Sequence, residues 1–287
     1  MRLPSPDACG WLDGRPMRVA EMGIAWTDPA AHVGLAAFET IAVRRGRPLE
    51  LAEHLERLAR SASRLRVVLP PVDALEATAR EAAAAEPTGC GWLKILVTRG
   101  GRWLVVTGAM PPDEEGRPIT AVLLPWRRDP RDPLAGVKCT SYAQHELGLE
   151  EARRRGADEG LWRNANGHLT EGCSSNLFVV IRRTITTPAV REGVLAGVVR
   201  DLAIRAARSL GLDMHETRVR VHRLAVAHEA FATSSLCGVR PLVCFDGRPI
   251  GNGTPGRVTR SVAEAVARLR GLVSSEGSGV EDARRDG

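Results

Sequence analysis

Lysine is almost absent from this sequence. Of its 40 basic residues only two are lysines, Lys94 and Lys138, and all the others are arginines. This bias makes each lysine worth separate attention, because a lysine amine can lose its proton near neutral pH and act as a nucleophile, whereas an arginine guanidinium cannot. A deprotonated lysine is also the side chain that condenses with an aldehyde to form a Schiff base.

Other absences exclude several classes of protein. Aromatic residues make up only 4% of the chain, and although its net charge is +6, the arginines are scattered without a recognisable nucleic-acid-reading element, so we expect no nucleic-acid partner. No apolar run approaches the ~18 residues that a membrane helix needs, so we expect no membrane segment. The six cysteines form no Cys-x-x-Cys pair, and we expect no signal peptide at the N-terminus, which together favour free thiols in a reducing cytoplasm.

The chain has the length of two modest domains or one large one. A proline-rich and acidic stretch resembles a linker, so we expect a smaller N-terminal α/β domain at residues 1–112, a linker at 113–118 and a larger C-terminal α/β domain at 119–272. Residues 273–287 are polar and charged, which predicts a disordered tail.

Strands and helices are expected to alternate without a regular β-α-β rhythm, so the predicted fold class is α+β or mixed α/β. A hairpin is expected at 10–16. Hydrophobic periodicity predicts helices at 51–65, 73–86, 142–155, 195–210 and 255–269, and strands at 37–43, 92–97, 103–106, 119–125, 159–162, 168–170, 177–181, 230–233 and 242–245.

Short motifs in a fixed order extend from about residue 35 to about residue 260. They are Phe38-Glu39-Thr40, the Glu-His-Leu-Glu-Arg-Leu run at 53–58, Thr-Arg-Gly at 98–100, the Lys138 segment to Tyr142, Gly-Ala-Asp-Glu at 156–159, Thr-Glu-Gly-Cys-Ser-Ser-Asn-Leu-Phe at 170–178, Leu-Ala-Gly-Val-Val-Arg at 195–200, and the segment 231–241. Together they resemble the class IV (fold type IV) pyridoxal-phosphate enzymes, which include branched-chain aminotransferases, D-amino acid aminotransferases and aminodeoxychorismate lyases. The resemblance implies two domains with the active site between them, pyridoxal 5′-phosphate as cofactor, and a homodimer.

The resemblance assigns three charged residues to the cofactor. Lys138 is expected to hold it as a Schiff base and then to move the substrate Cα proton. Glu171 is expected to pair with the pyridine nitrogen, because a carboxylate there keeps the ring protonated and able to accept electrons. Arg57 matches the phosphate-binding arginine, and a guanidinium fork suits a phosphate dianion. His54, one turn earlier on the same helix, is expected to have a supporting or packing role.

Further phosphate donors are expected from two other segments. The helix predicted to begin near residue 195 offers the backbone N–H groups of Val198 and Val199 at its positive end. Relatives commonly have a threonine in this turn, and its hydroxyl is missing here. Ser235 falls where relatives place a phosphate-binding threonine. Tyr142, the only tyrosine, is expected either to bond the cofactor's phenolic oxygen or to pack in the core.

The substrate side is expected to include Phe38, Thr40, Lys94 and Arg102. Lys94 alternates with Trp92 and Leu96 on one strand face, which leaves a carboxylate-binding or phosphate-binding role open beside a solvent-facing one. Arg102 follows a shortened loop and is a candidate replacement for the substrate-carboxylate arginines of several relatives.

Three functions remain open at this stage. Aminotransfer between an amino acid or amine and a 2-oxo acid is the broader class and our first expectation. Thr40 favours the second, aminodeoxychorismate lyase, which releases pyruvate and 4-aminobenzoate, since lyases often have threonine at that position. The third is an inactive cofactor-binding or scaffold relative, against which Lys138 and Glu171 argue.

Overall fold

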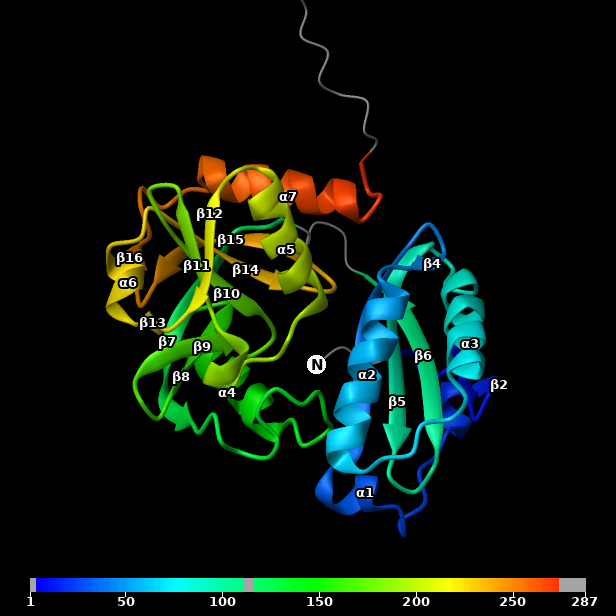
Figure 1. Ribbon diagram of the computed structural model, residues 1–287. Coiled ribbons are helices and arrows are strands. Elements are labelled where there is room, and N and C mark those ends of the chain that lie inside the picture. Colours follow the sequence, from blue (N-terminus) through cyan, green and yellow to red (C-terminus); the bar gives the residue numbers. More distant parts are fainter. Residues whose placement is uncertain (1–3, 111–115, 274–287) are drawn as a thin grey trace, which may run out of the picture.

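The computed structural model describes residues 4–110 and 116–273, and within them the chain builds two sheets (Figure 1). The first sheet is antiparallel throughout, with strand order β2-β1-β6-β5-β3-β4. Its strands are β1 (Cys9–Leu12), β2 (Arg15–Arg18), β3 (Ala36–Arg44), β4 (Arg47–Pro48), β5 (Cys90–Thr98) and β6 (Trp103–Ala109).

Helices α2 (Leu51–Leu65) and α3 (Val72–Ala84) pack on one face of this sheet. The helix α2 follows its predicted bounds because Leu51, Leu55, Leu58, Ala62 and Leu65 recur at helical spacing and are all buried. Strand β3 supplies Ile41 and Val43 to the same core, and β5 supplies Leu93, Ile95 and Val97. The alternate residues of β3 and β5 therefore point to the opposite face.

The second sheet is mixed and has ten strands. Its order is β12-β11-β10-β14-β15-β7-β8-β9-β13, with β16 paired to β15. The strands are β7 (Ile119–Arg128), β8 (Glu159–Asn164), β9 (His168–Gly172), β10 (Asn176–Ile181), β11 (Thr184–Pro188), β12 (Asp213–Thr217), β13 (Val219–Arg220), β14 (Glu229–Ser234), β15 (Gly238–Phe245) and β16 (Arg248–Pro249).

Helices cover the second sheet through separate clusters of apolar side chains. Helices α5 (Val198–Ser209) and α7 (Arg257–Leu269) pack side by side over β14 and β15, where Phe178 and Phe231 stack with ring centroids 4.6 Å apart (Figure 1). Helix α4 (Ala143–Arg154) packs on β7 and β8. The remaining helices are short: α1 (Pro29–Val33), α6 (His222–Ala225) and the 3₁₀ turns η1 (Val19–Glu21) and η2 (Val190–Glu192).

The segment between β7 and α4 connects the two halves of the molecule. The Phe38 N–H donates to the Lys138 carbonyl at 3.1 Å, and the Thr140 N–H donates to the Ala36 carbonyl at 2.9 Å. Cys139 is buried in the core under the first sheet. Because successive side chains of an extended segment point to opposite sides, burial of Cys139 turns Lys138 and Thr140 away from that core.

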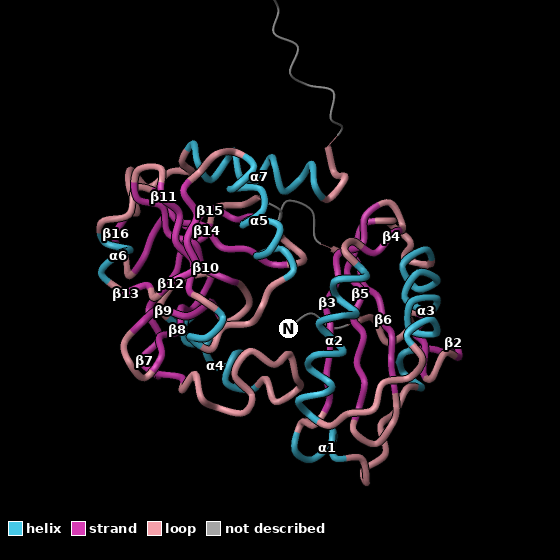
Figure 2. The backbone as a smooth tube through the Cα atoms, viewed as in Figure 1, coloured by secondary structure: helices cyan, strands magenta, loops and turns pink. Residues whose placement is uncertain are grey.

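The predicted mixed fold class is confirmed, and the residue bounds of several elements need correction. The helix expected from residue 195 begins at Val198, because Gly197 is extended (φ −70°, ψ 136°) and is its N-cap residue. Strands β11, β12 and β13 and helix α1 were not predicted. Figure 2 shows β6 among the strands of the first sheet and β7 among those of the second, so the chain passes from one sheet to the other between these two strands. The predicted linker lies outside the described residues at 113–115, as does the predicted tail at 274–287.

Candidate active site

Residues from both sheets line a cavity of about 650 Å³. Its walls come from β3, β5, the Lys138 segment, the β9–β10 turn, the start of α5 and the β14–β15 turn. Ten of the eleven predicted site residues line it: Phe38, Thr40, Arg57, Lys94, Lys138, Tyr142, Glu171, Val198, Val199 and Ser235. The chain thus brings together residues that are up to 197 positions apart, from Phe38 to Ser235.

The exception is Arg102. It lies in the turn between β5 and β6, where its guanidinium pairs with Asp13 at 3.0 Å and is half exposed. It is not among the residues that line the cavity of this chain. The resemblance made Arg102 a candidate replacement for the substrate-carboxylate arginines of several relatives, but the turn directs its side chain towards Asp13 beside the β1–β2 hairpin.

Lys138 has an amine suited to nucleophilic chemistry. Its Nζ lies 4.5 Å from the centroid of the Phe38 ring. Burial of the amine, together with the nearby positive charge of Arg57, lowers the pKa of Lys138 to about 8. A lysine with this pKa is partly neutral at physiological pH, which an exposed lysine is not.

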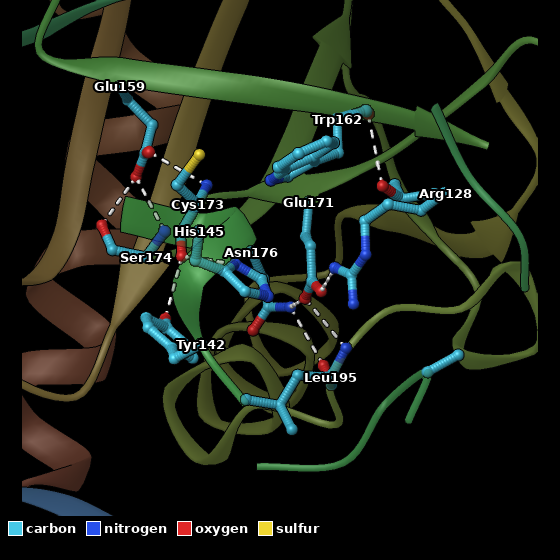
Figure 3. A network of polar contacts seen from close by, with 12 residues as sticks. Arg128, Tyr142, His145, Glu159, Trp162, Glu171, Cys173, Ser174, Asn176 and Leu195 are labelled. Carbon is cyan, nitrogen blue, oxygen red and sulfur yellow. Dashed lines mark hydrogen bonds and ion pairs between the residues drawn. The ribbon is translucent and has the colours of Figure 1, made fainter. Parts of the chain in front are cut away.

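Glu171 is a buried carboxylate with three donors (Figure 3). Arg128 donates to its Oε1 from Nη1 at 2.9 Å, and its Oε2 accepts from the Leu195 N–H at 2.8 Å and from Asn176 Nδ2 at 3.3 Å. Burial raises the pKa of Glu171, while Arg128 and the Leu195 N–H act in the opposite direction. These donors fix the orientation of the carboxylate at the cavity wall.

Arg57 is held by a buried carboxylate that the sequence analysis did not assign. Glu39 accepts from Arg57 Nε at 2.8 Å and from Nη2 at 2.7 Å, and it lies 2.7 Å from His54 Nδ1. Burial alone would raise the pKa of Glu39, but Arg57 beside it lowers that pKa to about 2. Arg57 Nη1 also donates to the Ala196 carbonyl at 3.3 Å. His54 therefore supports this network, as the sequence suggested.

The start of α5 offers backbone donors that suit an anion. The N–H groups of Val198 and Val199 occupy the first turn, where a helix leaves backbone donors without acceptors and carries its positive end. Gly197 is required immediately before them, because a Cβ there would overlap Asn176 Oδ1. Ser235 lines the same cavity from the β14–β15 turn.

Tyr142 contributes to both the cavity and its packing. Its hydroxyl donates to the Cys173 carbonyl at 2.9 Å, and the same carbonyl is 3.0 Å from His145 Nδ1. The Tyr142 ring stacks on the His145 ring at 4.3 Å and meets the Phe38 ring edge-on at 5.6 Å. Burial raises the pKa of Tyr142 and lowers the pKa of His145 to about 3, so both side chains are neutral near pH 7.

One face of the first sheet forms the opposite wall. Phe38 pairs across the strands with Leu96, and Thr40 pairs with Lys94. These four side chains and Trp92 all line the cavity, so the half-buried Lys94 side chain faces the cavity. The Lys94 amine lies 4.9 Å from the centroid of the Phe38 ring. Burial lowers the pKa of Lys94, and Glu146 opposes this effect only in part.

Sequence reasoning missed Arg128 and gave Glu39 and Glu159 no role. Glu159 accepts from the hydroxyls of Ser174 and Ser175 at 2.8 and 2.9 Å, which anchors the turn after Glu171 (Figure 3). In a chain rich in arginine, nothing in the sequence distinguishes Arg128 from its neighbours. The position of Glu39 inside the Phe-Glu-Thr motif was the one available signal.

Comparisons with known proteins agree with this geometry. A family model described as amino-transferase class IV matches residues 36–243. The branched-chain-amino-acid aminotransferase of Escherichia coli K12 is 26% identical over 286 residues, covering 90% of this chain and 92% of that protein. D-alanine aminotransferase of Bacillus licheniformis is 28% identical over 274 residues, covering 89% and 94% respectively. A structure of the T.th. branched-chain amino acid aminotransferase with pyridoxamine 5′-phosphate superimposes with a TM-score of 0.83 at 26% identity, covering 93% and 95% respectively.

The chain belongs to the class IV aminotransferases, with the fold of fold type IV. It is a pyridoxal-phosphate-dependent enzyme, and the residues present fit that cofactor. The cavity provides a partly neutral amine at Lys138, a buried carboxylate at Glu171 and an anion site at the start of α5. Among the described residues, no helix is both long and apolar enough to cross a membrane.

Proposed function

We propose that the cavity residues divide into a cofactor side and a substrate side. On the cofactor side, Lys138 bonds covalently to the cofactor, and Glu171 pairs with its ring nitrogen. Arg57, Ser235 and the first N–H groups of α5 bind its phosphate. The observation that carries this proposal is that the Lys138 amine and the Glu171 carboxylate line one cavity between the two domains.

When bound, pyridoxal 5′-phosphate supplies an electron-accepting ring that makes the proton on a substrate Cα acidic. Lys138 acts as the base for that proton, because its lowered pKa keeps a neutral amine available near pH 7. In aminotransfer the protonated Lys138 amine would then give this proton back at the cofactor's former aldehyde carbon, on the other side of the nitrogen that joins substrate and cofactor. Burial raises the pKa of Glu171, and the donors Arg128 and the Leu195 N–H oppose that effect and favour the carboxylate form that would pair with the ring nitrogen.

On the substrate side we propose an amino acid as donor and a 2-oxo acid as acceptor, as the names of the relatives indicate. The wall formed by Phe38, Trp92 and Leu96 provides apolar area for a side chain. Lys94 on the same wall provides a cation for a carboxylate. Thr40, which pairs with Lys94 across the strands, provides a hydroxyl on the same wall.

Aminodeoxychorismate lyase is the second candidate, and the position of Thr40 in the cavity favours it. A lyase needs the same base at Lys138 but a wall that accepts a cyclic dicarboxylate. A half-reaction separates the two. The protein loaded with cofactor is mixed with single amino acids or with aminodeoxychorismate, without a 2-oxo acid.

Aminotransfer predicts that an amino acid converts the cofactor stoichiometrically to its pyridoxamine form. The lyase predicts release of pyruvate and aminobenzoate while the cofactor stays in its aldehyde form. Absence of both reactions across a broad panel, with the cofactor bound, would support an inactive relative and overturn both proposals.

We also propose a cytoplasmic homodimer with domain boundaries at residues 112 and 119. The large exposed apolar side chains of Trp26, Val33, Trp126 and Leu147 support an association surface. The distribution of strands between the two sheets supports the boundaries. In chain order β6 is the last strand of the first sheet, and the next strand, β7, belongs to the second sheet.

A further inference from the structure

A buried ion pair outside the cavity lining joins the two domains. Arg270 donates to Glu50 Oε1 from Nε at 3.1 Å and to Glu50 Oε2 from Nη2 at 3.2 Å. The two side chains are only 1% and 9% exposed. Arg270 is the C-cap residue of α7 in the second domain, and Glu50 is the N-cap residue of α2 in the first domain. In Figure 1 the red end of α7 accordingly extends towards β4 and the first domain.

The same guanidinium also holds the β14–β15 turn. Arg270 Nη2 donates to the Ser235 carbonyl at 2.8 Å. The next residue of the turn is held by a second hydrogen bond, in which Arg44 Nη2 donates to the Leu236 carbonyl at 3.4 Å. Ser235 and Leu236 both line the cavity. The backbone of the turn that presents the Ser235 hydroxyl is therefore fixed by an arginine outside the cavity lining.

Glu50 connects the ion pair with Arg270 to the helix that carries Arg57, the other side chain proposed to bind the phosphate. Its backbone is left-handed (φ 49°, ψ 37°), and its side chain makes no capping bond to its own helix. Its carbonyl accepts from the His54 N–H at 3.0 Å, so Glu50 begins the turn that leads to His54 and Arg57. Arg270 thus holds the beginning of the Arg57 helix and the Ser235 turn at once.

The energetics favour a positioning role over a purely stabilising one. Removing two charges from water costs about as much as their attraction returns, so a buried pair gives little net stability compared with apolar side chains of the same size. A two-pronged arginine does impose direction, because its donors lie in a rigid plane. That plane here meets a carboxylate of one domain and a carbonyl of the other.

We propose that Arg270 is a positioning residue for the cofactor phosphate. Through its contacts with the Glu50 carboxylate and the Ser235 carbonyl, Arg270 sets the distance between the Arg57 guanidinium and the Ser235 hydroxyl. This inference rests on the proposed phosphate roles of Arg57 and Ser235. It concerns the phosphate alone, so the aldehyde-binding chemistry of Lys138 is independent of it.

The test compares two aldehydes that differ only in the phosphate. Apoenzyme is titrated with pyridoxal 5′-phosphate and with pyridoxal. The dissociation constant for pyridoxal divided by that for pyridoxal 5′-phosphate measures how much the phosphate contributes to binding. Arg270→Met is expected to reduce that ratio by about tenfold, and Arg270→Lys is expected to restore part of it because a cation remains. Arg268→Met is the matched control, since Arg268 is exposed in the last turn of the same helix.

Thermal unfolding of each apoenzyme separates positioning from stability. If Arg270→Met lowers the melting temperature but weakens both aldehydes equally, the residue is only structural and the inference is wrong. The same conclusion follows if Arg268→Met changes the ratio as much. If Arg270→Met fails to fold, Glu50→Gln and Arg270→Lys provide the same comparison, and an unchanged ratio in both overturns the inference. Failure of the wild type to bind either aldehyde at Lys138 would instead refute the proposed function.

Discussion

Replacing Glu39 by glutamine tests the buried network that holds Arg57. The substitution keeps the size of the side chain and removes its charge. In the wild type the pKa of Glu39 falls from the ordinary value of 4.5 to about 2 in the folded protein. A difference of about 2.5 units at ~1.4 kcal/mol per unit corresponds to about 3 kcal/mol of stability near neutral pH.

The sign of the pH dependence follows from the lowered pKa. A carboxylate whose pKa is lower in the folded state stabilises the protein above its unfolded pKa, and that contribution is lost as the pH falls towards the folded pKa. The Glu39 contribution is therefore complete above a pH of about 5 and decreases from the unfolded value of 4.5 towards about 2. Other carboxylates titrate in this window, so the informative quantity is the difference between wild type and Glu39→Gln.

Urea unfolding of the apoenzymes at several pH values measures that difference. We expect about 3 kcal/mol near neutral pH, with a clear decrease as the pH falls from about 6 to about 3. Glu56→Gln on the same helix is the control, because Glu56 pairs with Arg60 at 3.7 Å and its side chain is 72% exposed. That variant should cost less than ~1 kcal/mol. A wild-type-to-Glu39→Gln difference that does not change with pH would refute the reasoning.

Three further substitutions test the site. Arg128→Met should raise the pKa of Glu171 further, and the pH at which the bound cofactor changes its absorption spectrum should shift relative to wild type; an unshifted spectral titration would contradict this. Gly197→Ala forces a Cβ into the space of Asn176 Oδ1, so we expect at least a roughly tenfold loss of cofactor affinity, measured by absorbance titration. Arg102→Ala should leave KM for amino acid and 2-oxo acid within about twofold of wild type in steady-state assays, because the side chain lies outside the cavity lining.

Local periodicity determined much of what could be predicted. Helix α2 has its expected bounds because five apolar residues recur at helical spacing and its core is built from neighbours in sequence. The alternation in β5 also placed Trp92, Lys94 and Leu96 on one face, and that face lines the cavity. Both results depend on spacing within a single element.

Strand β11 was missed because its burial does not follow hydropathy. Its Thr186 and Thr187 are buried, and their hydroxyls donate to the Val179 and Leu177 carbonyls at 3.3 and 2.7 Å. A threonine becomes suitable for a core when a neighbouring strand supplies an acceptor. That acceptor comes from β10, and single-sequence periodicity contains no information about the pairing of the two strands.

The positions of Arg128 and Arg102 depended on similar long-range contacts. The pairing of β7 with β8 shifts register between Leu123 and Arg127, just before Arg128, which pairs with Glu171. Such an irregularity redirects the side chains beyond it. Arg102 instead follows a tight turn and meets Asp13 of a distant hairpin. Neither outcome could be inferred from the charge of the residue or from its neighbours in sequence.

The most direct test of the central claim is to locate the lysine that carries the cofactor. The protein is incubated with pyridoxal 5′-phosphate, the adduct is reduced with borohydride, and the modified peptide is identified by mass spectrometry. We expect one modified side chain, Lys138, and no stable adduct in Lys138→Ala. Modification at Lys94 instead, or no lysine adduct in the wild type, would contradict it.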